Sequence, residues 1–409
     1  MKKFLKINEN VIVVNGAYNS AIYDFKTRLV YSINSESADF IKSLVVPHKS
    51  FTFEEQNYIK RLVEMGLLNQ DLNVSEESFL NNEYNDLNFV WLELTERCNE
   101  KCIHCYGEFG RNIKSKDLLL SDWKTILFKL KKCGCKKIQF IGGEPLLFKD
   151  FSLLLDYAIE LKFEELSIFT NATLLTNSLI KKIKDNNISV KISLYGHNSE
   201  VHDNITQMAG SFNKTISNLE LLYKIGVNTS IAIIIMKENE TYLDDIINFI
   251  KTKNFKFNGY DVIRGKIDSE QYKHIPNQET IRKKYIIEPN FYADKKFFMA
   301  SLFQNTCWYG KFAITPSGDI IPCIFARNYV MGNILTMDLK KFLADNQIKK
   351  YWYLPKDEIE VCKDCEYRYA CKDCRPLGEA ISGNFLGKFS RCTYNPYKGV
   401  WENKGVNIC

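Results

Sequence analysis

Between residues 88 and 264 the sequence alternates strictly between strand-like and helix-like segments, and this alternation constrains the fold more than any other feature. Six apolar segments are predicted as strands: Asn88–Glu96, Lys137–Gly142, Glu165–Asn171, Val190–Leu194, Asn228–Met236 and Gly259–Arg264. Helical spacing of apolar residues fills the gaps, at Trp123–Leu130, Phe151–Leu161, Leu179–Ile183, Ile216/Leu219/Tyr223 and Leu243/Ile247/Ile250. Strands that alternate with helices form parallel sheets, whose ligands bind at the carboxyl ends of the strands. The sequence therefore predicts an α/β fold with a partial (β/α)6 barrel.

The segments on either side of this core predict a small module at the front and a loop-rich region at the end. The front module has three predicted strands, one turn signal and two helix starts: Val11–Val14, Ser20–Phe25, Leu29–Ile33, the turn Asn15-Gly16, and helices from about Ser37 and Thr52. We predict a module over 1–70, a polar linker over 71–87, the barrel core over 88–265, a bridging region over 266–300 and a cysteine-rich domain over 301–409.

The distribution of the 13 cysteines indicates metal or cluster ligation. Three lie within eight residues, eight lie after residue 300, and Cys133 and Cys135 stand apart as predicted packing thiols. Thiols stay reduced in the cytosol, so a disulfide framework is the less natural interpretation. Three plus eight is the number that three iron–sulfur clusters need when one of them keeps an iron free of protein sulfur. Two four-cysteine zinc sites are an alternative for the eight, but they leave the first three unexplained.

The first three cysteines form the motif Cys98-x3-Cys102-x2-Cys105, directly after the first predicted strand of the core. Three thiolates on one loop can each bind one iron of a four-iron cluster, which leaves the fourth iron open to a small molecule. A zinc site or chance spacing is the alternative. The position at the carboxyl end of a barrel strand is typical of catalytic groups.

This motif, with His104 before its last cysteine, resembles the signature of the radical S-adenosylmethionine superfamily. The resemblance implies that Cys98, Cys102 and Cys105 hold a catalytic 4Fe–4S cluster that cleaves S-adenosylmethionine reductively. Later segments match the family in order, and the resemblance assigns the binding of S-adenosylmethionine to His104, Gly142, Gly143, Glu144, Pro145, Thr170, Asn171, Ser193 and Lys214. Because Gly142 and Gly143 have no side chains, the backbone of this turn can approach the methionine amino group. The Glu144 carboxylate then offsets the positive charge of that amino group. In the family, the residue that binds the methionine carboxylate is usually an arginine, which can donate two parallel hydrogen bonds. This chain has Lys214 at that position, and a lysine acts as a single point charge.

The late cysteines resemble the SPASM extension of radical enzymes that modify peptides and proteins. The resemblance implies two auxiliary clusters, hence three 4Fe–4S clusters in all, the first held by Cys307, Cys323 and Cys374 and the second by Cys362, Cys365, Cys371 and Cys392. Either Cys409 completes the first auxiliary cluster, or its open iron binds a substrate thiolate. The chain departs from the family pattern because only Lys372 and Asp373 separate Cys371 from Cys374, where three residues are usual.

The front module resembles the winged-helix element that binds leader peptides in many peptide-modifying enzymes. The whole pattern is similar to SPASM maturases of ribosomal peptides, which implies hydrogen abstraction from a precursor peptide, a crosslink (thioether first) and an external electron donor such as flavodoxin or ferredoxin. The alternatives are a maturase that oxidises a protein cysteine or serine, as in anaerobic sulfatase maturation, and a non-enzymatic iron–sulfur redox protein. A wing with only a structural or dimerising role is the alternative for residues 1–70.

Charge and hydropathy predict neither a nucleic-acid nor a membrane partner. The net charge of +6 is spread over 409 residues, with only short lysine runs such as Lys131–Lys132. The longest apolar runs, such as Ile231–Met236, are far shorter than the roughly 18–20 residues of a membrane span. The start, Met1–Leu5, is soon followed by Asn8, Glu9 and Asn10, which does not fit a secretory signal. We therefore expect a cytoplasmic protein.

Overall fold

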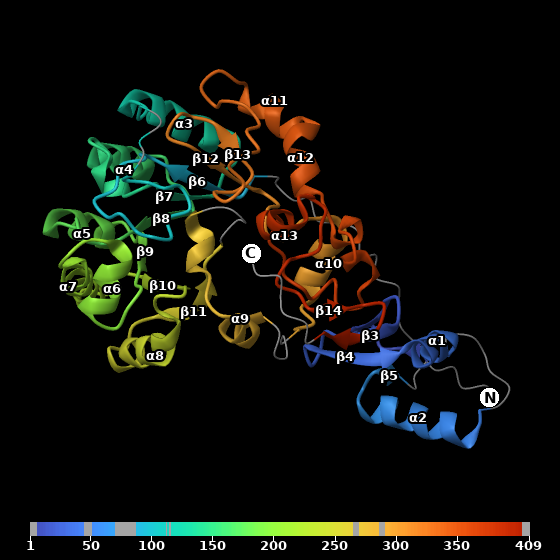
Figure 1. Ribbon diagram of the computed structural model, residues 1–409. Coiled ribbons are helices and arrows are strands. Elements are labelled where there is room, and N and C mark those ends of the chain that lie inside the picture. Colours follow the sequence, from blue (N-terminus) through green and yellow to red (C-terminus); the bar gives the residue numbers. More distant parts are fainter. Residues whose placement is uncertain are drawn as a thin grey trace. The chain divides into compact units, whose positions relative to one another are not determined.

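The computed structural model describes residues 6–44, 51–69, 87–111, 113, 116–264, 270–285 and 291–402 (Figure 1), so that Cys409 lies outside the described residues. Within these ranges the chain divides into two compact units. One, the sheet unit, takes in residues 87–284 and 308–352. The other, the terminal unit, takes in residues 6–69, 285–307 and 353–402. The domain boundaries drawn from the sequence stay predictions, and residues 308–352 group here with the sheet.

The sheet unit is built on eight strands in the order β11-β10-β9-β8-β7-β6-β12-β13. Their bounds are β6 Phe89–Glu93, β7 Lys137–Ile141, β8 Glu165–Thr170, β9 Ser189–Ser193, β10 Thr229–Ile235, β11 Phe257–Val262, β12 Lys311–Ile314 and β13 Ile320–Ile321. Every pair from β11 to β12 is parallel, and only β13 runs antiparallel to its neighbour β12. The predicted α/β fold is confirmed, with all six predicted strands present in sequential order.

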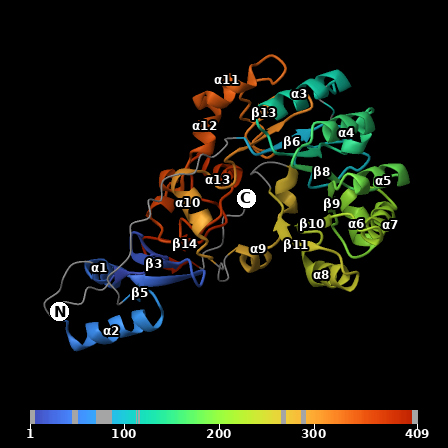
Figure 2. The same ribbon diagram turned by 180° about the vertical axis from the view of Figure 1, so that it is seen from behind.

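Helices of the sheet unit follow the strands in the predicted alternation. They are α3 Leu120–Lys132, α4 Phe151–Glu160, α5 Asn177–Asp185, α6 Ser199–Thr206, α7 Ser211–Lys224 and α8 Leu243–Thr252, with short helical turns η1 Pro145–Leu147, η2 Glu240–Tyr242 and η3 Glu270–His274 and later helices α9 Gln278–Tyr285, α11 Leu339–Ala344 and α12 Asn346–Trp352. In Figures 1 and 2, α3 to α8 cover the same face of the sheet. Their apolar stripes face the core, since Trp123, Leu219 and Ile250 are buried.

Strands β12 and β13 extend the sheet beyond the six predicted strands. Residues Lys311–Ile314 pair in parallel with β6, and the Gly310 carbonyl accepts hydrogen bonds from the amides of Asn88 and Phe89. The sequence analysis predicted no strand here because segments of four and two residues are too short to show a period.

The terminal unit contains a three-stranded antiparallel sheet with two helices, as predicted for the front module. Its elements are β1 Lys6–Ile7, β2 Val11–Asn15, β3 Asn19–Asp24, β4 Leu29–Asn34, α1 Ser35–Ser43, α2 Phe53–Glu64 and β5 Leu68–Asn69, followed by α10 Lys295–Phe303, η4 Lys356–Glu358, η5 Cys362–Asp364, α13 Arg375–Ser382, β14 Tyr394–Asn395 and β15 Val400–Trp401. Helix α2 begins with a capping box between Thr52 and Glu55, which explains its predicted start. Val11, Ile22, Ile41 and Leu62 share one core between sheet and helices.

The front sheet also packs against late segments of the chain. Val14, Ala21 and Tyr23 share a core with Ala293, Phe298 and Tyr369. The Tyr23 hydroxyl donates to the Glu366 carbonyl at 2.8 Å. The front module therefore shares a core with the region that carries the last cysteines.

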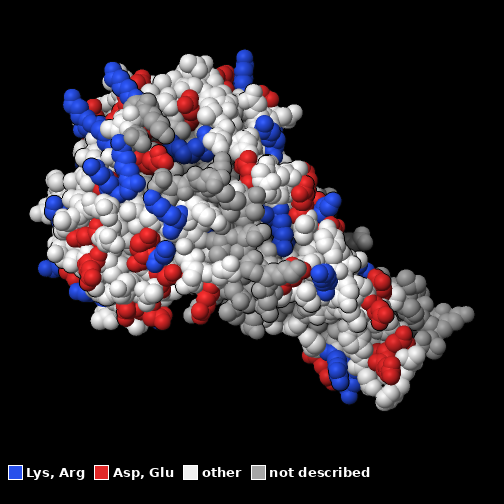
Figure 3. Space-filling view, viewed as in Figure 1, with Lys and Arg blue, Asp and Glu red and all other residues white. Residues whose placement is uncertain are grey.

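Charged side chains of both signs are interspersed over the described part of the face shown in Figure 3. Over the described ranges, the chain has no helix with the length and hydropathy that crossing a membrane requires.

Candidate active site

The loop that follows β6 carries Cys98, Cys102 and Cys105 at the carboxyl end of the sheet. Backbone hydrogen bonds tie this loop to helix α6, from the Lys101 amide to the Thr206 carbonyl at 2.9 Å and from the Ile103 amide to the Ile205 carbonyl at 3.0 Å. Because the loop has little regular structure of its own, these bonds to a neighbouring helix fix its path.

The three cysteines line one cavity of about 230 Å³ in the sheet unit. Predicted site residues on its wall are Cys98, Cys102, His104, Cys105, Gly142, Gly143, Thr170, Asn171 and Ser193. Burial raises the pKa of the Cys98 thiol to about 12 and raises the pKa of Cys102 and Cys105 as well. A positive group must therefore enter the cavity before these thiols ionise readily.

Gly142 and Gly143 place the turn after β7 directly against the cysteine loop. A Cβ at Gly142 would lie 2.7 Å from the Thr95 carbonyl oxygen, and one at Gly143 would lie 2.3 Å from the Arg97 carbonyl oxygen. The Gly143 amide donates to the Thr95 carbonyl at 2.8 Å. Only glycine permits this approach, and the same turn lines the cavity.

Glu144 lies behind the cavity wall and is fully buried. Its carboxylate accepts hydrogen bonds from the Thr170 hydroxyl at 2.8 Å, the Asn171 amide at 2.9 Å and the Leu146 amide at 3.1 Å. Burial raises the pKa of Glu144 to about 7, although these hydrogen bonds act in the opposite direction. The carboxylate thus joins the end of β8 to the glycine turn, and Thr170 and Asn171 reach the cavity themselves.

His104 and Ser193 lie on the cavity wall together with Tyr195, which the sequence analysis did not select. The His104 and Tyr195 rings meet edge to face with centroids 4.5 Å apart. Burial lowers the pKa of His104 to about 3, so this imidazole is neutral at physiological pH. Aromatic rings and a neutral imidazole make this wall suited to a planar heterocycle.

Three predicted binding residues do not line the cavity. Besides Glu144 behind the wall, Pro145 is buried in the turn η1, and Lys214 is exposed on α7. His202, which the sequence analysis did not assign as a ligand, accepts a hydrogen bond from the Tyr195 amide through Nδ1 at 3.2 Å. It therefore supports the segment that carries Tyr195.

Sequence reasoning missed two buried carboxyl groups near the cysteine loop. Glu100 lines the cavity, its Oε2 lies 3.3 Å from the Cys102 sulfur, and burial raises its pKa to about 8. Glu93, fully buried at the end of β6, pairs with Arg327 at 2.8 and 2.9 Å and accepts a hydrogen bond from Tyr106 at 3.0 Å. The sequence contained a signal for each of them. Glu100 lies inside the cysteine motif, and Glu93 is a charged residue at the end of an otherwise apolar strand.

A four-iron cluster with a cationic ligand fits this cavity. The buried atoms Glu100 Oε1 and His104 Nδ1 have no hydrogen-bond partner among the described residues, so the wall offers polar atoms to a ligand. Within the described ranges, no three Cys, His, Asp or Glu side chains gather closely enough to hold a single metal ion. A 4Fe–4S cluster of this kind binds one thiolate at each of three irons. Its three ligands therefore do not need to be as close together as the ligands of a single metal ion.

Four late cysteines are neighbours within the terminal unit. The Cys392 thiol is one of the groups that raise the pKa of Cys362, Cys365 and Cys371, after the larger effect of burial. These are the residues of the second predicted auxiliary set. Of the first predicted set, Cys307 and Cys374 belong to the terminal unit and Cys323 to the sheet unit.

Comparisons with known proteins agree with this geometry. The model of the radical SAM superfamily matches residues 92–250, and that of the SPASM iron–sulfur cluster-binding domain matches residues 307–366. The chain is 32% identical over 348 residues to the Fe-coproporphyrin III synthase of Methanosarcina barkeri, covering 74% of this chain and 86% of that protein. It is 25% identical over 369 residues to the antilisterial bacteriocin subtilosin biosynthesis protein AlbA of Bacillus subtilis, covering 85% and 80%.

The chain is also similar to a relative of another enzyme type and to a solved structure. The chain is 26% identical over 325 residues to a cysteine-type anaerobic sulfatase-maturating enzyme of Clostridium novyi, covering 69% of this chain and 86% of that one. The fold of this chain is similar to that of Streptococcus suis SuiB, which was solved bound to the precursor peptide SuiA. The TM-score is 0.56 and the identity is 18%, and the match covers 91% of this chain and 96% of SuiB. The chain belongs to the radical SAM superfamily and carries a SPASM iron–sulfur cluster-binding domain.

Proposed function

We propose that this radical SAM enzyme matures a ribosomal precursor peptide by installing a crosslink, with a thioether as the first candidate. The observation that carries the proposal is strand β4 of the terminal unit. It forms one edge of the three-stranded sheet, pairs among the described residues with β3 alone, and exposes Leu29, Ser32 and Asn34. Exposed sheet edges bind extended peptides as an added strand, which suits a leader peptide.

The extent of the similarities supports a peptide over a tetrapyrrole as substrate. The match to SuiB extends over 91% of this chain, and the match to AlbA over 85%. The match to the Fe-coproporphyrin III synthase extends over 74%, although its identity is higher. A match over 91% has to include part of the first 84 residues, where the exposed edge lies.

The cavity of the sheet unit suits the radical step. Cys98, Cys102 and Cys105 would hold a 4Fe–4S cluster, which when bound would supply the electron for reductive cleavage of S-adenosylmethionine. Around that chemistry, the apolar walls from Trp91, Phe169 and Ile234 exclude water. A bound cation lowers the pKa of the buried Glu100 carboxyl, which would then pair as a carboxylate with the sulfonium and amino groups.

Formation of a thioether removes one hydrogen from a peptide carbon and one from a thiol. The carbon-bound hydrogen would be taken up in 5′-deoxyadenosine, the thiol proton would pass to solvent, and the remaining electron would be accepted by an auxiliary cluster. Cys362, Cys365, Cys371 and Cys392 are proposed to hold one such cluster, and Cys307, Cys323 and Cys374 the other, with Cys409 as its fourth ligand or with an open iron. An external flavodoxin or ferredoxin supplies the first electron, and so many reduced thiols suit the cytoplasm.

Mass spectrometry of a short peptide encoded near the enzyme and co-expressed with it tests this proposal. A crosslinked product has lost two hydrogens, resists thiol alkylation and forms no hydrazone, because it contains no aldehyde. Oxidation of a serine or cysteine, as in the sulfatase alternative, produces an aldehyde that reacts with hydrazides. If the reduced, reconstituted protein forms no 5′-deoxyadenosine at all, a redox protein without enzymatic activity is the better description.

A further inference from the structure

Lys356 is a buried lysine beside the second predicted set of auxiliary ligands. It lies in the turn η4 and is 7% exposed. Its Nζ forms an ion pair with Asp373 Oδ2 at 3.6 Å, but it has no hydrogen-bond partner among the described residues. A buried ammonium with unused N–H donors is costly, so its position calls for an anionic neighbour.

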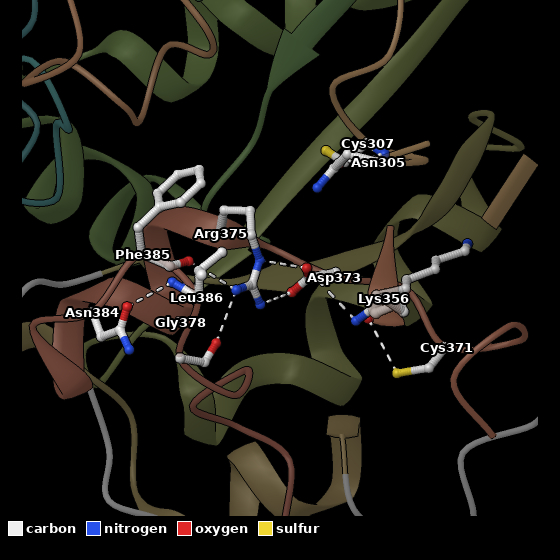
Figure 4. Close-up of polar contacts among 12 residues, drawn as sticks. Asn305, Cys307, Lys356, Cys371, Asp373, Arg375, Gly378, Asn384, Phe385 and Leu386 are labelled. Atoms are coloured by element: carbon white, nitrogen blue, oxygen red, sulfur yellow. Dashed lines mark hydrogen bonds and ion pairs between the residues drawn. The ribbon is translucent and has the colours of Figure 1, made fainter. Parts of the chain in front are cut away.

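Asp373 is shared between two cations, because its carboxylate also binds Arg375, at shorter distances than Lys356. Figure 4 shows the side chains of Asp373 and Arg375 facing each other. Arg375 Nε donates to Asp373 Oδ2 at 2.5 Å, and Arg375 Nη2 donates to Asp373 Oδ1 at 2.6 Å. Arg375 is 2% exposed and also donates to the Phe385 and Gly387 carbonyls at 3.0 and 2.8 Å. The buried group of two cations and one anion therefore keeps an excess positive charge, and this charge sits on Lys356.

Lys356 lies beside the segments that carry Cys362 and Cys371. The Ile359 amide donates to the Lys356 carbonyl at 3.1 Å, and the Lys363 amide donates to the Ile359 carbonyl at 2.9 Å, so η4 is joined to the turn η5, which begins at Cys362. On the other side, Asp373 lies two residues after Cys371, and Figure 4 draws Lys356, Asp373 and Cys371 in one group. The Lys356 ammonium therefore lies between the two segments that carry these cysteines.

We propose that Lys356 raises the reduction potential of the cluster held by Cys362, Cys365, Cys371 and Cys392, and so makes that cluster an electron acceptor. A 4Fe–4S cluster with four thiolates is an anion, and one-electron reduction adds another negative charge. A buried cation stabilises the reduced form more than the oxidised form, and N–H groups directed at sulfur act in the same direction. The inference rests on the proposed assignment of these four cysteines, and Lys356 is a positioning charge without contact to substrate.

A potentiometric titration of the reconstituted full-length enzyme, followed by electron paramagnetic resonance and without peptide, tests the inference. Lys356→Met removes the charge and leaves Asp373 paired with Arg375, so the protein is expected to fold and to keep its iron. At the wild-type midpoint potential, the ratio of reduced to oxidised cluster is expected to fall at least tenfold, which corresponds to about 59 mV for one electron. Asp373→Asn removes the anion and is expected to raise the same ratio.

Lys356→Arg is the matched control, because it keeps the charge and is expected to hold the midpoint near that of the wild type. An unchanged midpoint in Lys356→Met at full iron content overturns the inference. An equal shift in Lys356→Arg and Lys356→Met also overturns it, because packing would then be the cause. Absence of a cluster on these four cysteines overturns it together with their assignment. The titration uses no peptide, so a failed search for a crosslinked product leaves its outcome unaffected.

Discussion

The two groups of cysteines, one in each unit, sit in opposite electrostatic surroundings. The Cys98 loop of the sheet unit has buried carboxyl groups nearby, Glu100 on the cavity wall and Glu144 behind it. The late cysteines of the terminal unit have the buried cation Lys356 next to them. Buried carboxyl groups with raised pKa values ionise when a cation binds and so favour a sulfonium ligand, whereas positive charge favours a cluster that takes up electrons. The contrast indicates a division of labour between the two sites.

The two sites also differ in how the chain supports them. Backbone hydrogen bonds and the close approach of Gly143 to the Arg97 carbonyl hold the Cys98 loop. Buried ion pairs around Asp373 support the segment that carries Cys371 and Cys374. Changes to backbone shape are therefore expected to damage the first site more, and changes to charge are expected to retune the second.

Removing one thiol from each site separates their roles and gives the largest expected effect. Cys98→Ala is expected to lower 5′-deoxyadenosine formation at least about a hundredfold, because a proposed ligand of the cleaving cluster is lost. Cys371→Ala is expected to keep that reaction and lose the modified peptide. Chromatography of 5′-deoxyadenosine and mass spectrometry of the peptide measure the two outcomes. Equal loss of 5′-deoxyadenosine in both variants would contradict the division.

Removing one cation from each unit compares their buried ion pairs. Arg327→Met leaves Glu93 buried with Tyr106 as its remaining partner. It is expected to lower the free energy of unfolding by about 3 kcal/mol. Lys356→Met leaves Asp373 bound to Arg375 and is expected to cost less than about 1 kcal/mol. Urea denaturation followed by circular dichroism measures both, and a larger loss for Lys356→Met would reverse the comparison.

The pH dependence of stability reports on the buried carboxyl group behind the first site. The pKa of Glu144 is raised from 4.5 to about 7, so the folded protein binds more protons than the unfolded chain between these values. Stability from this group is complete below about pH 4.5 and is lost as the pH rises through about 7. Glu144→Gln carries no titrating proton, so the stability difference between wild type and variant is expected to fall by up to about 3 kcal/mol over this window.

Tryptophan fluorescence suits this measurement, since Trp91, Trp123, Trp308 and Trp352 belong to the sheet unit and only Trp401 belongs to the terminal unit. Urea titrations of the cluster-free protein at several pH values give the free energies. A difference between wild type and variant that stays constant with pH would show that Glu144 does not titrate in this range.

Adding one methyl group at each site compares their backbone packing. Alanine at Gly143 would meet the Arg97 carbonyl oxygen at 2.3 Å, so the cysteine loop must shift. Gly143→Ala is expected to cost about 1–3 kcal/mol and to lower the iron content of the first cluster. Alanine at Gly378, near the late cysteines, would meet the Gly387 carbonyl oxygen at 2.9 Å, and a smaller loss is expected. Iron analysis and urea denaturation of both variants decide whether the first site is the more sensitive to backbone shape.

Local patterns made most of the sheet unit predictable, whereas contacts between distant residues did not follow from them. The six parallel strands and the Cys98 loop depend on residues that are close in sequence, so period and spacing were sufficient. Strand β12 pairs with β6 across more than two hundred residues, and Glu93 meets Arg327 over a similar separation. Nothing near Lys356 in the sequence indicates that it joins Asp373 and the late cysteines. Sequence reasoning thus selected the cysteines but missed the charges around them.

Lys214 offers the smallest expected effect and the sharpest test of a residue carried over by resemblance. The resemblance assigns it to the methionine carboxylate, yet its side chain is exposed on α7 and does not line the cavity. An exposed lysine contributes little to a buried ligand, so Lys214→Ala is expected to change the dissociation constant of S-adenosylmethionine less than about twofold. Isothermal titration calorimetry of the reconstituted enzyme measures this constant, with Glu100→Gln as the comparison that is expected to weaken binding about tenfold. A tenfold loss in Lys214→Ala instead would mean that α7 moves toward the cavity when the ligand binds, and that the family assignment of this residue holds after all.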